Sequence, residues 1–140
     1  MLMLIMAFAC AGGDTSEDDT SEDTAIPDGD LELSPGFAVE TVAGTAEGEE
    51  ELTTCAGWFP RTPQHQMRLE ASMTGMYLEA DTDAVVLRVI FSENGSEFCS
   101  DLDSGLPRVE RGSWSSGVYE VYVGTPGPSG SVAYVLTAYE

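Results

Sequence analysis

The residues that could carry chemistry in this chain of 140 residues are few, and the only imidazole among them is His65. A Ser-His-Asp arrangement would therefore depend on that residue. It lies between two glutamines at the start of an apolar alternation, and no Gly-x-Ser-x-Gly motif occurs in the chain. The sequence predicts a packing or surface histidine, and a hydrolase of unrecognised type is the least favoured interpretation.

One of the three cysteines lies close to the start of the chain. Cys10 directly follows Ala7-Phe8-Ala9, the small-residue pattern at which signal peptidases cut. A cysteine at this place resembles that of a bacterial lipoprotein, in which the thiol is acylated and becomes the first residue of the mature chain. The alternative is a soluble secreted protein that is cut at the same bond and keeps Cys10 as a free thiol.

Cys55 and Cys99 remain as an even pair if Cys10 is acylated. Exported domains meet an oxidising compartment, where paired thiols are usually bridged. The count therefore favours a disulfide between Cys55 and Cys99, and two buried thiols are the alternative. A zinc site is a third interpretation that fits poorly, because two cysteines and His65 supply only three soft ligands at unrelated spacing.

The N-terminal part of the sequence predicts a targeting signal followed by a linker. Residues 1–11 form an apolar run that is too short to cross a bilayer of roughly 30 Å, and we expect residues 1–9 to be a signal peptide. The stretch that follows is mainly Asp, Glu, Ser, Thr and Gly, which cannot bury enough apolar surface to offset the entropy of ordering. We therefore expect residues 10–30 to be a disordered acidic linker.

The formal net charge is -20, and it is unevenly spread. The first 51 residues hold 14 of the 25 acidic residues and no basic residue, whereas all five arginines lie downstream. A chain with this charge and no basic patch repels phosphate backbones and anionic lipid. Nucleic acid is therefore excluded as a partner, a membrane is expected only through the lipid anchor, and the folded domain is expected over residues 31–140.

Past Leu31, short apolar alternations separated by turn residues predict β-strands. Asn94-Gly95 tolerates the positive φ angles of a tight turn, so residues 97–99 should return as the second arm of a hairpin. No run of ten residues has apolar residues at helical spacing without Gly or Pro. We therefore expect an all-β fold, a single antiparallel β-sandwich (jelly-roll or Ig-like) of about seven or eight strands. The clearest alternations cover residues 67–71, 76–80, 84–91, 118–123 and 132–139.

Exposed aromatic residues are the candidates for a binding surface, because aromatic faces stack on sugars and pack on proteins. We expect Trp58, Trp114 and Tyr122 to form such a surface. Tyr122 should point away from Tyr119 and Val121, its neighbours on the same strand. The expected partner is an envelope or extracellular protein or a polysaccharide.

Several strings occur in a fixed order along residues 55–140. They are Cys55-Ala56-Gly57-Trp58-Phe59-Pro60, Pro63-Gln64-His65-Gln66-Met67-Arg68-Leu69, Tyr77-Leu78-Glu79-Ala80-Asp81-Thr82-Asp83, Cys99-Ser100-Asp101-Leu102-Asp103-Ser104-Gly105, Pro107-Arg108-Val109, Gly117-Val118-Tyr119-Glu120-Val121-Tyr122-Val123-Gly124 and Ala133-Tyr134-Val135-Leu136. Together these strings resemble the bacterial pre-peptidase C-terminal domain in order and spacing.

The resemblance implies a β-sandwich that accompanies secreted peptidases or stands alone on exported proteins, without catalytic residues, as a folding, targeting or substrate-binding accessory. It also implies a bond between an early cysteine and Cys99. It further implies a core position for Trp114 at the end of the sandwich, because the family places an apolar residue before the Gly-Tyr strand.

Some members of that family bind calcium through acidic loop residues, and the matching positions here are Asp101 and Asp103. Calcium takes about six to eight oxygen ligands, so Asp81, Asp83 or backbone carbonyls would have to complete the site. Leu102 replaces an acid that is common in this stretch, which removes one ligand. The alternative is that the aspartates form turns by bonding their own backbone.

Together these observations predict a non-catalytic exported lipoprotein of the bacterial cell envelope, anchored at the outer membrane or in the periplasm. Its β-sandwich would bind or assist another molecule. A calcium-dependent structural or adhesive module is the alternative function, and soluble secretion is the alternative location. No cofactor other than calcium is expected.

Overall fold

The computed structural model describes residues 29–100, 105–128 and 130–140, and the structural statements below concern these residues. The predicted signal peptide (1–9), Cys10 and nearly all of the predicted linker lie outside them, as do Asp101 and Asp103. The described ranges contain strands and no helix, which confirms the all-β class. They accordingly contain no helix with the length and hydropathy to cross a membrane.

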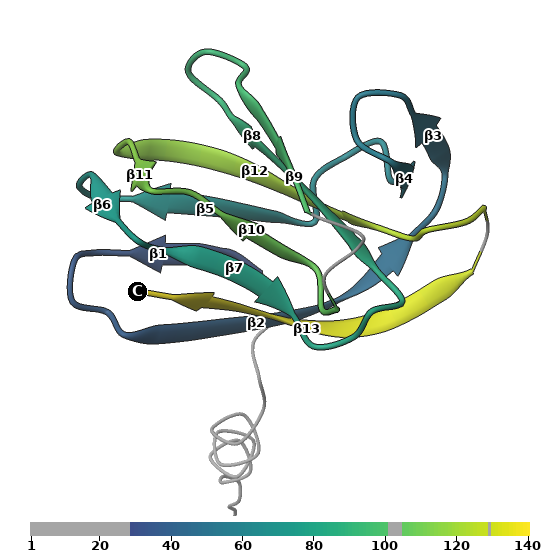
Figure 1. The fold of residues 1–140 in the computed structure, drawn as a ribbon, viewed down its shortest axis with the longest axis horizontal. Helices are drawn as coiled ribbons and strands as arrows, with labels where there is room; N and C mark the ends of the chain where they lie inside the picture. Colours follow the sequence, from purple (N-terminus) through teal and green to yellow (C-terminus); the bar gives the residue numbers. More distant parts are fainter. Residues whose placement is uncertain (1–28, 101–104, 129) are drawn as a thin grey trace, which may run out of the picture.

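Two sheets face each other and form the sandwich (Figure 1). The five-stranded sheet has the order β1 (Leu31–Leu33), β5 (His65–Leu69), β12 (Gly117–Gly124), β8 (Val86–Phe91) and β9 (Glu97–Cys99). The four-stranded sheet has the order β10 (Arg108–Glu110), β7 (Tyr77–Ala80), β13 (Ser131–Tyr139) and β2 (Val39–Glu47). Two short pairs complete the described strands: β3 (Glu50–Leu52) with β4 (Gly57–Phe59), and β11 (Ser113–Trp114) with β6 (Met73–Thr74).

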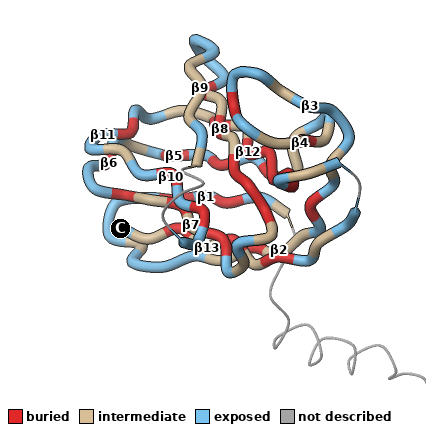
Figure 2. The backbone as a smooth tube through the Cα atoms, turned by 45° about the vertical axis from the view of Figure 1, so that its right-hand side comes forward, coloured by how far each residue is buried: buried red, intermediate tan, exposed pale blue. Residues whose placement is uncertain are grey.

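The core lies between the two sheets because the long strands alternate apolar and polar side chains (Figure 2). On β8, Leu87, Val89 and Phe91 belong to this core. On β13 the core-facing residues include Leu136 and Ala138, neither of which exposes any surface. Each large apolar side chain buried in this way stabilises the fold by ~1.5–3 kcal/mol.

The predicted hairpin at Asn94-Gly95 is confirmed. β8 and β9 pair antiparallel, and Gly95 has a φ angle of 77°. Asn94 closes the turn through its side chain, because its Oδ1 accepts a hydrogen bond from the backbone N–H of Ser96 at 2.9 Å.

The strand count and one strand direction differ from the expectation. The two facing sheets hold nine described strands rather than seven or eight, because β1, β9 and β10 have three residues each and are too short to show a clear alternation. β1 pairs with β5 in parallel, whereas the other pairs in these two sheets are antiparallel. Parallel pairing needs a long connection, and here β2, β3 and β4 lie between the two strands in sequence.

The outer side of the five-stranded sheet is partly covered by the hairpin of β3 and β4. A second, smaller apolar cluster forms there, in which Cys55 and Phe59 of the hairpin region pack on Val86 and Tyr122 of the sheet. The hairpin reaches the sheet closely at Gly124, where a Cβ atom would lie 2.0 Å from the carbonyl oxygen of Trp58. Glycine is therefore required at that position for the hairpin to dock.

Candidate functional site

Trp114 is a core residue, and its assignment to an exposed binding surface is wrong. The side chain exposes none of its surface, and its Nε1–H donates a hydrogen bond to the carbonyl oxygen of Met76 at 2.7 Å. Its ring meets Tyr119 edge-on with 5.4 Å between the centroids. The short β6–β11 pair folds over the end of the sandwich and holds the indole inside, which agrees with the core position that the family resemblance implied.

Tyr122 points away from Tyr119 as the alternation predicted, but it is not an exposed aromatic residue. Only 9% of it is accessible, because the β3–β4 hairpin covers it. Burial raises the pKa of its phenol. Trp58, on that hairpin, is half-buried, and its backbone N–H and C=O both bond Thr125 at 2.8 Å. The sequence could not show this cover, because it depends on which distant segment folds back over the strand.

Cys55 and Cys99 form a disulfide that fastens the hairpin region to β9, as the cysteine count favoured. The carboxylate of Glu97 lies beside the two sulfur atoms, and these three residues are the one group among the described residues that could hold a metal ion. The sulfur atoms are bonded to each other and are not thiolates, so the zinc interpretation has no support here. His65 does not belong to this group.

His65 is a buried packing residue that connects the two sheets. Its Nε2 and the Tyr134 hydroxyl are 2.6 Å apart, and its Nδ1 bonds the carbonyl oxygen of Gly29. In the neutral imidazole this arrangement requires the ring proton on Nδ1, which donates to the Gly29 carbonyl, and Nε2 then accepts from the phenol. His65 is 3% exposed, so its imidazole packs between the sheets and is not accessible as a general base would be.

Asp81 and Asp83 are exposed at the turn between β7 and β8. The carboxylate of Asp81 is bonded to backbone: its Oδ1 accepts a hydrogen bond from the N–H of Val135 at 2.9 Å. Described residues on each side of the segment 101–104 lie against the same region: Ser100 N–H bonds Leu87 O at 2.9 Å, and Ala80 N–H bonds Pro107 O at 3.1 Å.

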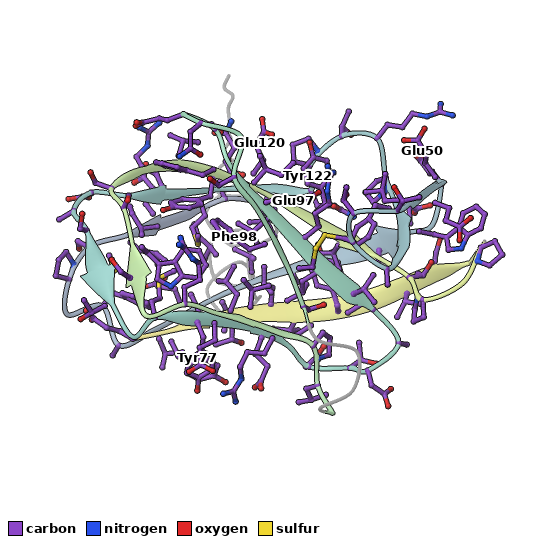
Figure 3. All side chains as sticks on the ribbon, turned by 45° about the horizontal axis from the view of Figure 1, so that its top comes forward. Glu50, Tyr77, Glu97, Phe98, Glu120 and Tyr122 are labelled. Atoms are coloured by element: carbon purple, nitrogen blue, oxygen red, sulfur yellow. A yellow bond between two sulfur atoms is a disulfide. The ribbon has the colours of Figure 1, made fainter. Side chains whose placement is uncertain are left out.

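A stacked row of side chains crosses the outer face of the four-stranded sheet, and the sequence-based candidates did not include it. The rings of Tyr77 on β7 and Tyr139 on β13 stack with 4.8 Å between centroids and 22° between planes. The guanidinium of Arg108, on β10, lies 4.2 Å from the centroid of the Tyr77 ring. Figure 3 shows Tyr77 on the opposite side of the sandwich from Tyr122. We call these three residues the tyrosine row.

Two carboxylates form ion pairs with the guanidinium of Arg108, which lies at one end of the tyrosine row. Arg108 Nη2 lies 3.1 Å from Glu79 Oε2, and its Nη1 lies 3.7 Å from Glu110 Oε1. The hydrogen bonds that the Arg108 guanidinium donates to Glu79 raise the pKa of this guanidinium. A hollow of about 360 Å³ lies beside this network and is lined by the two carboxylates, Arg108 and Leu106, which is 41% exposed. The outer face therefore offers aromatic, apolar and charged contacts together.

The alternation of buried and exposed positions in β7 and β13 could have pointed to this surface. Tyr77 and Glu79 lie opposite the core residues of β7, and Tyr139 lies opposite the core residues of β13. The sequence did not show that β7 and β13 are neighbours with Tyr77 directly across from Tyr139.

The buried phenol of Tyr134 should make the protein less stable at high pH. Burial raises the pKa of its phenol above the ordinary value near 10. Below about pH 10 the phenol is neutral in both states and the stabilisation is complete, but above it the unfolded chain ionises first, so the free energy of unfolding falls. We expect denaturant titrations from about pH 8 to pH 11 to show this fall, and Tyr134→Phe to make it shallower.

The control for that measurement is built into the fold, because burial also raises the pKa of Tyr119 and Tyr122. A part of the slope should therefore survive in Tyr134→Phe. A fall of unchanged steepness in that variant would contradict the buried placement of Tyr134.

Comparison with solved structures identifies the fold. The pre-peptidase C-terminal domain of a collagenase from Bacillus anthracis superposes with a TM-score of 0.51, covering 82% of this chain and 99% of that domain at 9% sequence identity. The chain has the fold of that domain. No family profile matches the sequence, and no curated protein sequence matches it.

Periplasmic inhibitors of g-type lysozyme show a more distant likeness. A mutant of the Escherichia coli inhibitor covers 82% of this chain and 98% of its own length at 11% identity, with a TM-score of 0.45. The Salmonella Typhimurium inhibitor covers 79% of this chain and 96% of its own length at 9% identity, with a TM-score of 0.43.

Proposed function

We propose that this chain is an exported, non-catalytic binding module of the pre-peptidase C-terminal type, carried on an acidic linker and anchored to the bacterial envelope through Cys10. The observation that carries the proposal is the fold, which follows that of a collagenase's pre-peptidase C-terminal domain over 82% of this chain. The Cys55–Cys99 disulfide supports an oxidising compartment. The buried place of His65 supports a role without catalysis.

The outer face of the four-stranded sheet is the binding surface that we assign to this module. The outer side of the other sheet is partly occupied by the β3–β4 hairpin. On the four-stranded sheet, the tyrosine row and the exposed Val39 beside Tyr139 present apolar area next to Arg108 and Glu79. Such a mixture of aromatic and charged contacts suits an envelope protein or a polysaccharide.

Cosedimentation of the purified chain with peptidoglycan sacculi and with outer-membrane fragments tests this proposal. We expect the wild type to be retained on one of the two, and the double variant Tyr77→Ala/Tyr139→Ala to lose about tenfold in retention. Trp58→Ala is the matched control, because it removes a half-buried aromatic side chain from the hairpin instead. Absence of retention, or a loss with Trp58→Ala but not with the tyrosine variant, would contradict the assigned surface.

Calcium-dependent stabilisation is the second candidate function. It is favoured by the position of Asp81 and Asp83, since Ser100 and Pro107, on either side of residues 101–104, bond Leu87 and Ala80 around the same turn. If calcium binds there, millimolar calcium should raise the melting temperature by several degrees over a chelator. Asp83→Asn should reduce the rise, whereas Asp30→Asn should not. Equal melting temperatures with calcium and with chelator would leave the aspartates as turn formers.

A further inference from the structure

β2 is a nine-residue strand at the edge of the four-stranded sheet. Its one neighbour among the described strands is β13, with which it pairs over its whole length. Among the described residues the other side of β2 is therefore a free edge, and such an edge is a template on which another strand can pair.

The pairing pattern shows which backbone groups point out along this edge. Asp81 N–H bonds Val135 O, and Asp81 Oδ1 accepts Val135 N–H, so Val135 on β13 faces β7. The next residue, Leu136, must face β2, and its register partner Val42 faces back toward β13. The alternate residues of β2 then direct their N–H and C=O groups away from the sheet, and no described residue bonds them. They are Thr41, Ala43 and Thr45.

The centre of this edge lacks two features by which sheets usually avoid unwanted pairing, which are charged side chains and proline. Residues 41–46 are instead Thr-Val-Ala-Gly-Thr-Ala, a run with no charge and no proline. Glu40 stands directly before the run, and Glu47 with Glu49–Glu51 follows it.

We propose that the free edge of β2 binds an extended segment of a partner protein as an added strand. The segment would have an uncharged centre and lysine or arginine on both sides, because acidic residues bound the edge at both ends. A second copy of this chain fits less well, since its own acidic residues would meet Glu40 and Glu47. The inference takes its purpose from the proposed binding function, but its geometry is independent of the tyrosine row.

A shallow, open hollow beside the middle of the edge gives such a strand a place for one side chain. It has a volume of about 280 Å³ and lies where Ala43 and Gly44 of β2 come close to Gly29, Gln64 and His65. Main-chain pairing supplies affinity in strand addition, and pockets for alternate side chains supply specificity. We expect an inward-pointing side chain of the partner to lie in this hollow.

Fluorescence anisotropy and amide hydrogen exchange on the full chain test the proposal. The probe is the labelled peptide Lys-Lys-Thr-Val-Thr-Val-Thr-Lys-Lys. We expect it to bind, and to lose at least about tenfold in affinity when alternate amides are N-methylated or when its lysines are replaced by glutamate. The amides of Thr41, Ala43 and Thr45 should become protected on binding, whereas those of Val42 and Gly44 should be protected without peptide.

Two variants sharpen this test. Ala43→Pro removes an outward N–H but leaves the bonds to β13, so the peptide should bind at least about tenfold more weakly. Thr45→Val changes a side chain on the same strand and keeps its N–H, so affinity should stay unchanged. If Ala43→Pro fails to fold, the methylated peptide carries the same comparison on the wild type.

No binding of the unmodified peptide, equal binding of the N-methylated peptide, or protection elsewhere than at the edge would overturn the inference. If the peptide does not bind but envelope retention depends on Tyr77 and Tyr139, strand addition at β2 is overturned and the proposed binding surface is not. Peptide binding without any envelope retention would contradict the proposed surface instead.

Discussion

Replacing Trp114 by alanine is expected to lower the free energy of unfolding by about 3–5 kcal/mol. The indole is fully buried, packs edge-on against Tyr119 and Phe98, and donates to the Met76 carbonyl. The variant leaves a cavity at the end of the sandwich and an unsatisfied carbonyl oxygen. Since the free energy of unfolding of a small domain is about 5–15 kcal/mol in total, the variant should be close to unfolding. Urea denaturation followed by far-ultraviolet circular dichroism measures the loss.

Trp114→Phe is the control for that measurement. It keeps most of the ring volume and loses the hydrogen bond, so a smaller loss of about 1–2 kcal/mol is expected. A cost below about 1 kcal/mol for Trp114→Ala would instead place the indole at the surface, where it could belong to a binding site.

Removal of the disulfide is expected to cost about 4 kcal/mol, because Cys55 and Cys99 are separated by 44 residues in sequence and the bond restricts the unfolded chain. Loss of the bond also frees the segment that covers Val86 and Tyr122. We therefore expect the double variant Cys55→Ala/Cys99→Ala to unfold at lower urea and to expose Tyr122 to solvent. Denaturation curves and tyrosine accessibility report the two effects separately.

A reducing agent provides the matched comparison for the disulfide. Wild type under reduction should lose as much stability as the double variant, and the double variant itself should not respond to the reductant. Cys10→Ser should leave the denaturation curve unchanged. Unchanged stability of the wild type under reduction would contradict a bond that fastens the hairpin to β9.

The sequence predicted those parts of the fold that depend on local alternation. The strands containing Leu87, Tyr119 and Leu136, and the turn at Gly95, are where the period of two and the turn chemistry placed them. The three-residue strands could not be predicted, because so few residues carry no readable period. The parallel pairing of β1 with β5 could not be predicted either, since it depends on long-range packing.

The candidate site was harder to predict than the fold, because exposure is a property of the assembled sheets. Alternation gave the correct side of β12 for Tyr122 but could not show that the β3–β4 hairpin lies over it. The alternation within β7 and β13 is consistent with the outward positions of Tyr77 and Tyr139, but their stacking with Arg108 needs the strand order β10-β7-β13.

We propose that this sandwich acts outside the cytoplasm on a lipid tether at Cys10, and acyl labelling detects such a tether. The full chain is expressed in a bacterium that is supplied with a palmitate analogue. We expect a labelled chain in the membrane fraction with Cys55 and Cys99 oxidised, and no label on the Cys10→Ala variant. An unlabelled wild-type chain that stays reduced in the cytoplasm, or is released with Cys10 unmodified, would contradict it.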